Sequence, residues 1–156
     1  GKEQIIHISK PGEIIGFRAM FSGDSYKVSA TALEECNICF IGKEDFLNMI
    51  ETNASLRNGI MKELSKELAD RAVFITNMAQ KSVRERLAFA LLLLDDIYKD
   101  EMINLTREDM ANFVGTATET LIRLLKDFKE DGLIEIHTRK LEIIDKEKLI
   151  HLAGAH

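Results

Sequence analysis

The chain has little of what marks a secreted or membrane protein. Of its 156 residues only Cys36 and Cys39 are cysteines, so no disulfide framework can hold the fold together. The longest unbroken apolar run, Leu87 to Leu94, is far shorter than the roughly 20 residues that a bilayer-spanning helix needs. No signal-peptide pattern opens the chain. We therefore expect a soluble, cytoplasmic protein with no membrane partner.

An excess of positive charge is also missing. The chain has 21 Lys and Arg against 26 Asp and Glu, which gives a formal net charge of -5. Proteins that bind nucleic acid are usually basic, so this balance argues mildly against them. It does not exclude them, because binding depends on where the cations lie rather than on their sum. An apolar share of 46% is enough for the core of one domain or of two small ones.

Motifs of catalysis and metal binding are missing as well. The sequence has no phosphate-binding loop, nucleophile elbow or paired acidic motif. No element has ligand spacing among the histidines His7, His137, His151 and His156. Cys36 and Cys39 have the C-x-x-C spacing of redox or metal sites, but residues three apart on a strand point to opposite faces. That favours two small buried strand residues, and the sequence predicts neither an enzyme nor a metal site.

Three regions follow one another along the chain. Residues 1–51 begin with short β-like runs, separated by turns such as "KPG" and "SGDS", and end with a short helix, "KEDFLNMIE". The β-like runs are "EQIIHIS", "EIIGF", "KVSATAL" and "CNICFIG". Residues 52–80 predict one long helix that Thr52 or Asn53 can cap. Residues 81–156 mix helices with short strands, so the chain as a whole predicts an α+β fold.

The last region has the order of a winged helix-turn-helix unit. Ser82 and Glu85 have capping-box spacing at the start of one helix, and "MINL" predicts a short strand. Thr106 opens the next helix, and Gly115 follows it where a left-handed turn would end it. After one more helix, "LIEIH" and "KLEII" predict a two-stranded wing around "TRK". In such units the second helix of the motif enters the major groove of DNA.

The helix after Gly115 has two different faces. Its apolar stripe contains Leu121, Leu124, Leu125 and Phe128. Its polar side carries Thr118, Glu119, Arg123 and Lys126. Glu119 and Arg123 could form an ordinary i,i+4 ion pair, or Glu119 could complete a capping box with Thr116. Alternatively, Arg can bond to guanine O6 and N7 and a carboxylate can accept from cytosine N4. The position between a glycine turn and a wing favours this last interpretation.

The stretch "LTREDMANFVGTATETLIRLLKDFKEDGLIEI" resembles the helix-turn-helix signature of the Crp/Fnr family of transcription regulators, and the Fnr-like branch in particular. Upstream, "PGEIIGFRAMFSG" and "SATALEECNICFIGKEDFLNMIE" resemble the second half of the family's β-roll sensor and its short following helix. The resemblance implies that residues 1–51 form an N-terminally truncated, partial β-roll of the cyclic-nucleotide-binding type. It implies a dimerisation helix at 52–80 and a winged helix-turn-helix DNA-binding domain at 81–156.

The resemblance also implies roles for single residues. Glu119 and Arg123 would contact a conserved G·C pair of a TTGA-like half-site, and Thr118 stands at a third specificity position of the family. The family usually has Ser or Thr where this chain has Ala117, so capping of the helix would fall to Thr116. Contacts to DNA phosphates fix position without reading sequence, and we expect them from Arg107, Lys126, Arg139 and Lys140.

Family members that bind cyclic nucleotide hold its ribose with a Glu and its phosphate with an Arg. Here the stretch that matches the ribose-binding Glu is Gly16, Phe17 and Arg18, so an apolar ring stands where a hydrogen-bond acceptor is required. Lys27 lies near the position of the phosphate-binding Arg, and no Arg is present there. The resemblance therefore argues against cyclic AMP as effector, and we expect no cofactor in this chain. Cys39 matches the central cluster-binding cysteine of the Fnr branch in position, but an iron–sulfur cluster needs four ligands.

In the long helix, six residues have the 3-4-3-4 spacing of a two-stranded coiled-coil seam. They are Met61, Leu64, Leu68, Arg71, Ile75 and Met78. Five of them are apolar, which predicts a parallel homodimer through this face. Arg71 is the exception. It either pairs with Glu67 or Asp70 of the second chain, or packs only its stem while its charged end reaches water.

Our leading hypothesis is a dimeric, sequence-specific transcription regulator that binds an inverted repeat in double-stranded DNA, with RNA polymerase as a further partner. The alternative is a winged-helix module whose acidic surface binds a protein. The net charge of -5 favours the alternative, and the pair of Glu119 and Arg123 opposes it.

Overall fold

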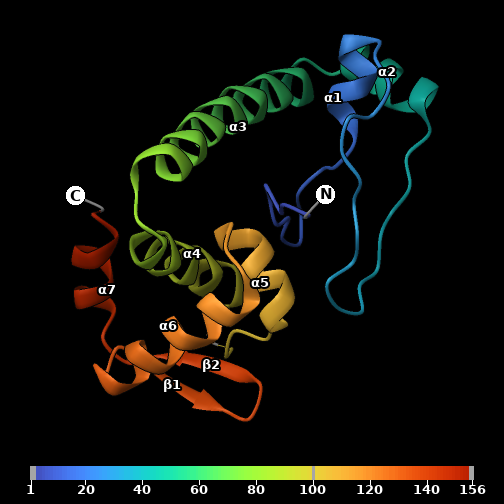
Figure 1. Cartoon of the computed structure of the whole chain (residues 1–156). Helices are drawn as coiled ribbons and strands as arrows, with labels where there is room; N and C mark the ends of the chain where they lie inside the picture. The colour runs from blue at the N-terminus through green and yellow to red at the C-terminus, as the bar shows by residue number, and fades with distance from the viewer. Residues whose placement is uncertain (1–2, 100, 155–156) are drawn as a thin grey trace. The chain divides into compact units, whose positions relative to one another are not determined.

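Helices make up most of the regular structure (Figure 1). The computed structural model describes residues 3–99 and 101–154, so His156 lies outside the described residues. In chain order the elements are α1 (Phe17–Ser22), α2 (Lys43–Thr52), α3 (Ala54–Gln80), α4 (Val83–Tyr98), α5 (Arg107–Val114), α6 (Thr118–Glu130), β1 (Ile134–His137), β2 (Lys140–Ile143) and α7 (Lys146–Ala153). This combination of helices and a small sheet confirms the predicted α+β class. The chain divides into two units, Gly1–Lys10 with Phe74–His156, and Pro11–Val73.

The unit Pro11–Val73 has a small apolar core. It consists of Phe17, Phe46, Ile50 and Ile60, with Met20, Leu56 and Leu64 packed against it. Asn53 lies between α2 and α3, and its side-chain oxygen accepts a hydrogen bond from the backbone N–H of Leu56 at 3.0 Å. This contact satisfies one of the unpaired N–H groups at the start of α3, so the predicted cap by Asn53 is confirmed.

The strands predicted before the short helix "KEDFLNMIE" are not present among the described residues. Residues 3–42 contain no strand, and "EIIGF" leads into α1 instead. A strand forms its ladder of backbone hydrogen bonds with a neighbouring strand. Alternation in a sequence shows which residues suit a sheet, but it does not supply that neighbour. Cys36 and Cys39 are both exposed free thiols, so they are not the buried strand pair that we expected.

The helix boundaries of the unit Phe74–His156 follow the predicted caps. The capping box at the start of α4 is complete: the N–H of Glu85 donates to the Ser82 hydroxyl at 3.3 Å, and the N–H of Ser82 donates to the Glu85 carboxylate at 2.8 Å. Thr106 caps α5 by accepting from the N–H of Asp109 at 3.0 Å. Gly115 ends α5 in the left-handed conformation, with φ of 73°. Side chains and one glycine therefore fix where these helices begin and end.

The predicted wing is present. β1 and β2 pair antiparallel along their whole length, and Thr138 and Arg139 form the turn between them, with Thr138 at φ of 57°. The predicted strand "MINL" is reduced to one bridge, in which Ile103 and Leu141 exchange two backbone hydrogen bonds of 2.9 Å. This bridge ties the connection between α4 and α5 to the wing.

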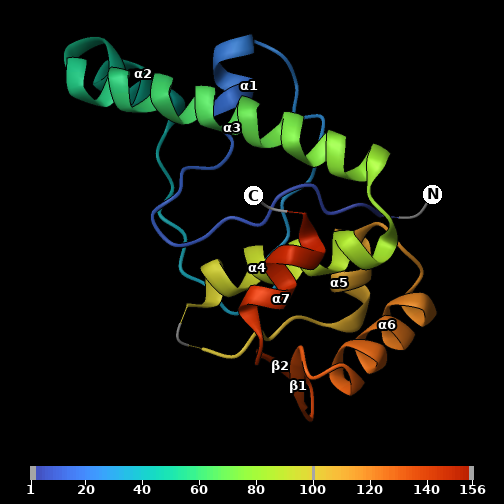
Figure 2. The same cartoon turned by 90° about the vertical axis from the view of Figure 1, so that its left-hand side faces the viewer.

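The core of this unit gathers around α4, which lies beside α7 and α5 (Figure 2). The largest fully buried side chains include Leu87, Leu91 and Leu94 of α4, Met110 of α5, Leu121, Leu125 and Phe128 of α6, Leu141 of β2 and Leu149 of α7. Because α6 buries side chains together with α4, α5, β2 and α7, it is held at the surface in a defined orientation.

Candidate nucleic-acid interface

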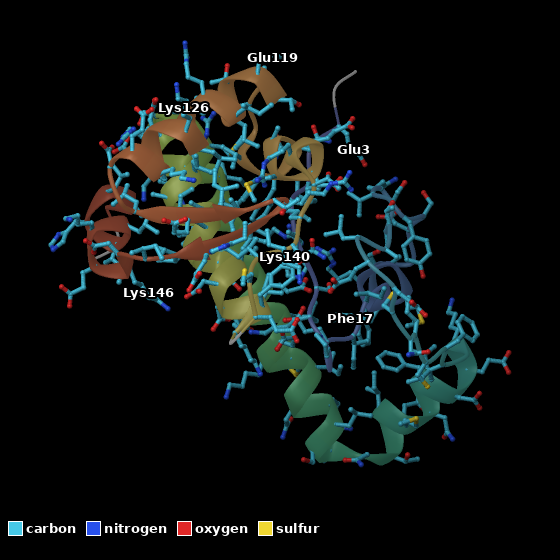
Figure 3. The ribbon with its side chains drawn as sticks, turned by 90° about the horizontal axis from the view of Figure 1, so that it is seen from below. Glu3, Phe17, Glu119, Lys126, Lys140 and Lys146 are labelled. Atoms are coloured by element: carbon cyan, nitrogen blue, oxygen red, sulfur yellow. The ribbon has the colours of Figure 1, made fainter. Side chains whose placement is uncertain are left out.

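Helix α6 buries one face and exposes the other. Leu121, Leu125 and Phe128 are at most 2% exposed, which confirms the predicted apolar stripe; Leu124 is half-buried. On the opposite side Glu119, Ile122, Arg123 and Lys126 are exposed, and Thr118 is half-buried. Figure 3 shows Glu119 and Lys126 on the outer side of α6, away from β1 and β2. The predicted base-contacting residues therefore share an accessible face.

The two structural explanations of Glu119 do not apply here. Ala117 is the N-cap of α6, with an extended backbone and no side-chain cap hydrogen bond. Glu119 is thus the second residue of the helix rather than the third, so a capping box with Thr116 is wrong. Within the described residues, 3–99 and 101–154, no ion pair joins Glu119 to Arg123. Lys126 instead approaches Glu130, with Nζ at 3.6 Å from Oε1.

The predicted phosphate-binding cations come from three elements. Arg107 is the first residue of α5 and is half-buried, and this burial lowers the pKa of its guanidinium; the group still stays protonated near neutral pH. Lys126 lies on α6. Arg139 in the turn of the wing and Lys140 on β2 are both exposed. Figure 3 shows Lys140 well apart from Glu119 and Lys126, so the wing cations form a second group.

Three residues near this face were missed by the sequence analysis. Ile122 is 53% exposed on the outer face of α6, next to Arg123. Arg84 of α4 pairs with Asp131, with Nη2 at 2.6 Å from Oδ2, and its guanidinium lies 4.8 Å from the ring centre of Phe128. Arg86 of α4 donates to backbone carbonyls of both the turn after α5 and the end of α3. The spacing of apolar residues gives no signal for such arginines, because their partners are backbone atoms or distant in sequence.

The predicted seam of α3 separates into exposed and inward residues. Met61, Leu68 and Ile75 are 62%, 74% and 66% exposed. Leu64 packs against the core of Pro11–Val73, and the side chain of Met78 lies against Gly115. Leu64 and Met78 thus have partners in their own chain, and their place in a dimer seam stays a prediction.

Arg71 of α3 is half-buried. Burial lowers the pKa of its guanidinium, the nearby Arg18 adds to that effect, and Glu67 and Asp70 oppose it. These charges all lie on its own chain, and the expected pairing of Arg71 with Glu67 or Asp70 of a second chain stays a prediction.

The positions that would hold a cyclic nucleotide are occupied differently. Phe17 is 1% exposed in the core of its unit, where it cannot accept a hydrogen bond from a ribose. Arg18 pairs with Glu67 at 3.4 Å, and Lys27 is exposed. In the described part of the chain no three His, Cys, Asp or Glu side chains are grouped for a metal ion. None of the helices described there is both long and apolar enough to cross a bilayer.

Known proteins resemble both regions of the chain. Residues 85–152 match the Crp-like helix-turn-helix domain, and residues 1–53 match the cyclic nucleotide-binding domain. The transcriptional activator protein anr of Pseudomonas aeruginosa is 30% identical over 161 residues, which cover 99% of this chain and 66% of that protein. The chain belongs to the Crp/Fnr family. This confirms the resemblance seen in the sequence. It also relates residues 1–53 to the cyclic nucleotide-binding domain, although no strands are described there.

Further proteins and solved structures are similar to this chain. Electron transport regulator A of Shewanella oneidensis is 32% identical, and the match covers 99% of this chain and 64% of that protein. The chain thus spans about two thirds of the length of these relatives, 66% and 64%. Among solved structures, FixK2 from Bradyrhizobium japonicum is similar in fold, with a TM-score of 0.69 over 74% of this chain and 61% of that chain at 18% identity. A CooA mutant from Carboxydothermus hydrogenoformans gives a TM-score of 0.63 over 70% of this chain and 54% of that chain at 26% identity.

Proposed function

We propose that this chain acts as a sequence-specific transcription regulator, which binds an inverted repeat of TTGA-like half-sites as a homodimer. The observation that carries the proposal is the outer face of α6. There Glu119 and Arg123 are both exposed, lie one helical turn apart, and are not consumed by a pair with each other or by a cap. The helix follows the left-handed turn at Gly115, as the second helix of a helix-turn-helix motif does.

The chemistry of this face fits the edge of a G·C pair. Arg123 would donate two of its guanidinium N–H groups to guanine O6 and N7, and the Glu119 carboxylate would accept from cytosine N4. Thr118 and Ile122 flank the pair, and an apolar side chain such as Ile122 suits the methyl group of thymine. Phosphate contacts from Arg107, Lys126, Arg139 and Lys140 would hold α6 in position without reading sequence.

A homodimer would form through the exposed stripe of α3. Met61, Leu68 and Ile75 repeat every seven residues, the period of a coiled coil. The exposed residues Ser65, Ala72 and Ala79 lie beside them and are small enough to let two helices approach closely. Two copies of α6 would then reach half-sites about one DNA turn apart, roughly 34–36 Å. We propose this stripe in place of the predicted one, because Leu64 packs on the core of its own unit and Met78 lies against Gly115.

The same proposal includes action without cyclic AMP, a place in the cytoplasm and RNA polymerase as further partner. The buried ring of Phe17 supports the first of these. Isothermal titration with millimolar cyclic AMP should give no saturable heat. A second candidate, a module whose acidic surface binds a protein, is favoured by the formal charge of -5.

Binding to an inverted TTGA repeat, measured against scrambled DNA over a salt series, tests the proposal. Glu119→Ala and Arg123→Ala should each lose on the order of 1–3 kcal/mol of discrimination. Lys140→Ala is the matched control: it should weaken binding to all DNA alike and reduce the salt dependence by about one phosphate contact. Full discrimination by both α6 variants would refute the assigned contacts. Equal, weak binding of the parent protein to both DNAs would favour the protein-binding alternative.

A further inference from the structure

One guanidinium joins the ends of two helices in the unit Phe74–His156. Arg86 lies in the first turn of α4. Its Nε donates to the carbonyl of Val114 at 3.1 Å and its Nη2 to the carbonyl of Gly115 at 3.1 Å. Its Nη1 donates to the carbonyls of Met78 and Lys81, at 3.3 and 3.4 Å. Arg86 therefore connects the end of α3 to the end of α5 and the turn that follows it.

The acceptors explain why an arginine occupies this place. The last carbonyls of a helix have no partner within the helix, and they carry the negative end of its dipole. Arg86 serves two such ends at once. The guanidinium is planar and holds its N–H groups in a fixed fork, whereas the ammonium of a lysine is a single compact charge on a flexible stem. Arg86 can thus fix a direction between two helix ends, and a lysine can supply charge there but no such geometry.

A second contact acts at the same junction. The methyl group of Met78, in the last turns of α3, lies so close to Gly115 that a Cβ at this glycine would collide with it. Gly115 also has φ of 73°, which glycine adopts without strain. Two contacts therefore join the turn before α6 to the end of α3. One is the Arg86 side chain, which donates to backbone carbonyls of both, and the other is the direct packing of Met78.

We infer that Arg86 is a positioning residue, which sets the direction of α6 relative to the end of α3 and so the half-site spacing that the dimer accepts. The inference rests on the proposed function, in which α3 forms the dimer and α6 contacts bases. The core of the unit holds α6 in place, and Arg86 joins the end of α3 to the turn that precedes α6. The direction of α6 relative to α3 therefore depends on this junction. Glu119 and Arg123 lie on α6 itself, and loosening the junction leaves their mutual geometry unchanged.

Spacing is therefore the readout that separates positioning from base contact. Adding or removing one base pair between half-sites moves them by about 3.4 Å and rotates them by roughly 34–36°. The parent protein should prefer one spacing over its neighbours by about tenfold or more, equivalent to about 1.4 kcal/mol. Arg86→Lys should reduce this preference several-fold while it keeps the preference for intact over scrambled TTGA half-sites.

Arg84→Lys is the matched control, because Arg84 lies in the same turn of α4 but contacts Asp131 and Phe128 and no carbonyl of α3. It should keep the spacing preference. Met78→Ala removes the packing contact and leaves every hydrogen bond of Arg86 in place, so it should weaken the spacing preference to a smaller degree. This second variant also decides the matter if Arg86→Lys does not fold.

The outcomes are distinct. A sharp spacing preference retained by Arg86→Lys overturns the inference, and so does a parallel loss of spacing and base discrimination, which would show a general structural role. If Arg86→Lys does not fold, an unchanged spacing preference in Met78→Ala overturns it as well. A parent protein that does not distinguish TTGA repeats from scrambled DNA refutes the proposed function and this inference with it. A parent that distinguishes them but accepts all spacings equally refutes the inference alone.

Discussion

The turn at Gly115 allows a quantitative test of how closely α3 approaches the helix-turn-helix motif. In Gly115→Ala the new Cβ meets two costs. The left-handed backbone, at φ of 73°, costs an L-residue about 1–2 kcal/mol. The methyl group of Met78 must also move, because it occupies the space of the new Cβ. It is the end of a flexible side chain, so we expect this to add only about 1 kcal/mol, toward the low end for overpacking.

Gly132→Ala is the control for the backbone cost. Gly132 has φ of 69° and no atom within 4 Å of the position of a Cβ, so only the first cost applies. Urea unfolding of all variants at one protein concentration, followed by circular dichroism, should show Gly115→Ala less stable than Gly132→Ala by about 1 kcal/mol. When both glycine variants also carry Met78→Ala, that difference should largely disappear, because neighbouring substitutions couple through a shared contact. Equal stabilities of the two glycine variants would refute the close approach of Met78.

Three further experiments test single features. The hydrogen bonds from Ser82 hold the pKa of the Glu85 carboxyl below its ordinary 4.5. Glu85 therefore stabilises the folded state above pH 4.5, and this stabilisation is lost as the pH falls through the lower pKa that the group has in the folded state. Unfolding of Glu85→Gln across this range should therefore depend less on pH, and an unchanged dependence would contradict the capping-box role. Leu68→Ala should shift the dimer toward monomer in sedimentation, with little change in the free energy of unfolding. Leu64→Ala should instead destabilise its unit, since Leu64 packs on the core of that unit. The reverse pattern would contradict the revised stripe. Replacing each thymine of the half-site in turn by uracil removes its methyl group. At one position this should weaken binding of the parent protein and leave binding of Ile122→Ala unchanged. Equal sensitivity of both proteins would exclude a methyl contact.

Local chemistry made the helix boundaries of the DNA-binding region predictable. Ser82, Thr106 and Gly115 act on backbone groups within a few residues of themselves, so their spacing in the sequence is sufficient to place α4 and α5. The burial of Leu121, Leu125 and Phe128 follows from helical periodicity in the same way. For α6 the rule failed at one residue, since no capping side chain marks its start and Ala117 takes that position.

Contacts between distant residues could not be predicted. The β-like runs of residues 3–42 match the composition of strands, but a strand also needs a partner that no local pattern provides. The seam of α3 was predicted from spacing alone, and two stripes of that helix fit a heptad pattern almost equally well. Only packing decides between them: Leu64 and Met78 contact their own chain, while Met61, Leu68 and Ile75 remain exposed.

The N-cap of α6, Ala117, limits what mutagenesis can reveal about this protein. No side chain caps the helix there, so the N–H groups of its first turn have water as their natural partner in the absence of DNA. Such groups are good donors to phosphate, and every residue type except proline carries one. An alanine scan along α6 would leave these donors in place and would undercount the share of affinity that comes from the main chain. Backbone amide-to-ester replacement in the first turn would be required to measure it.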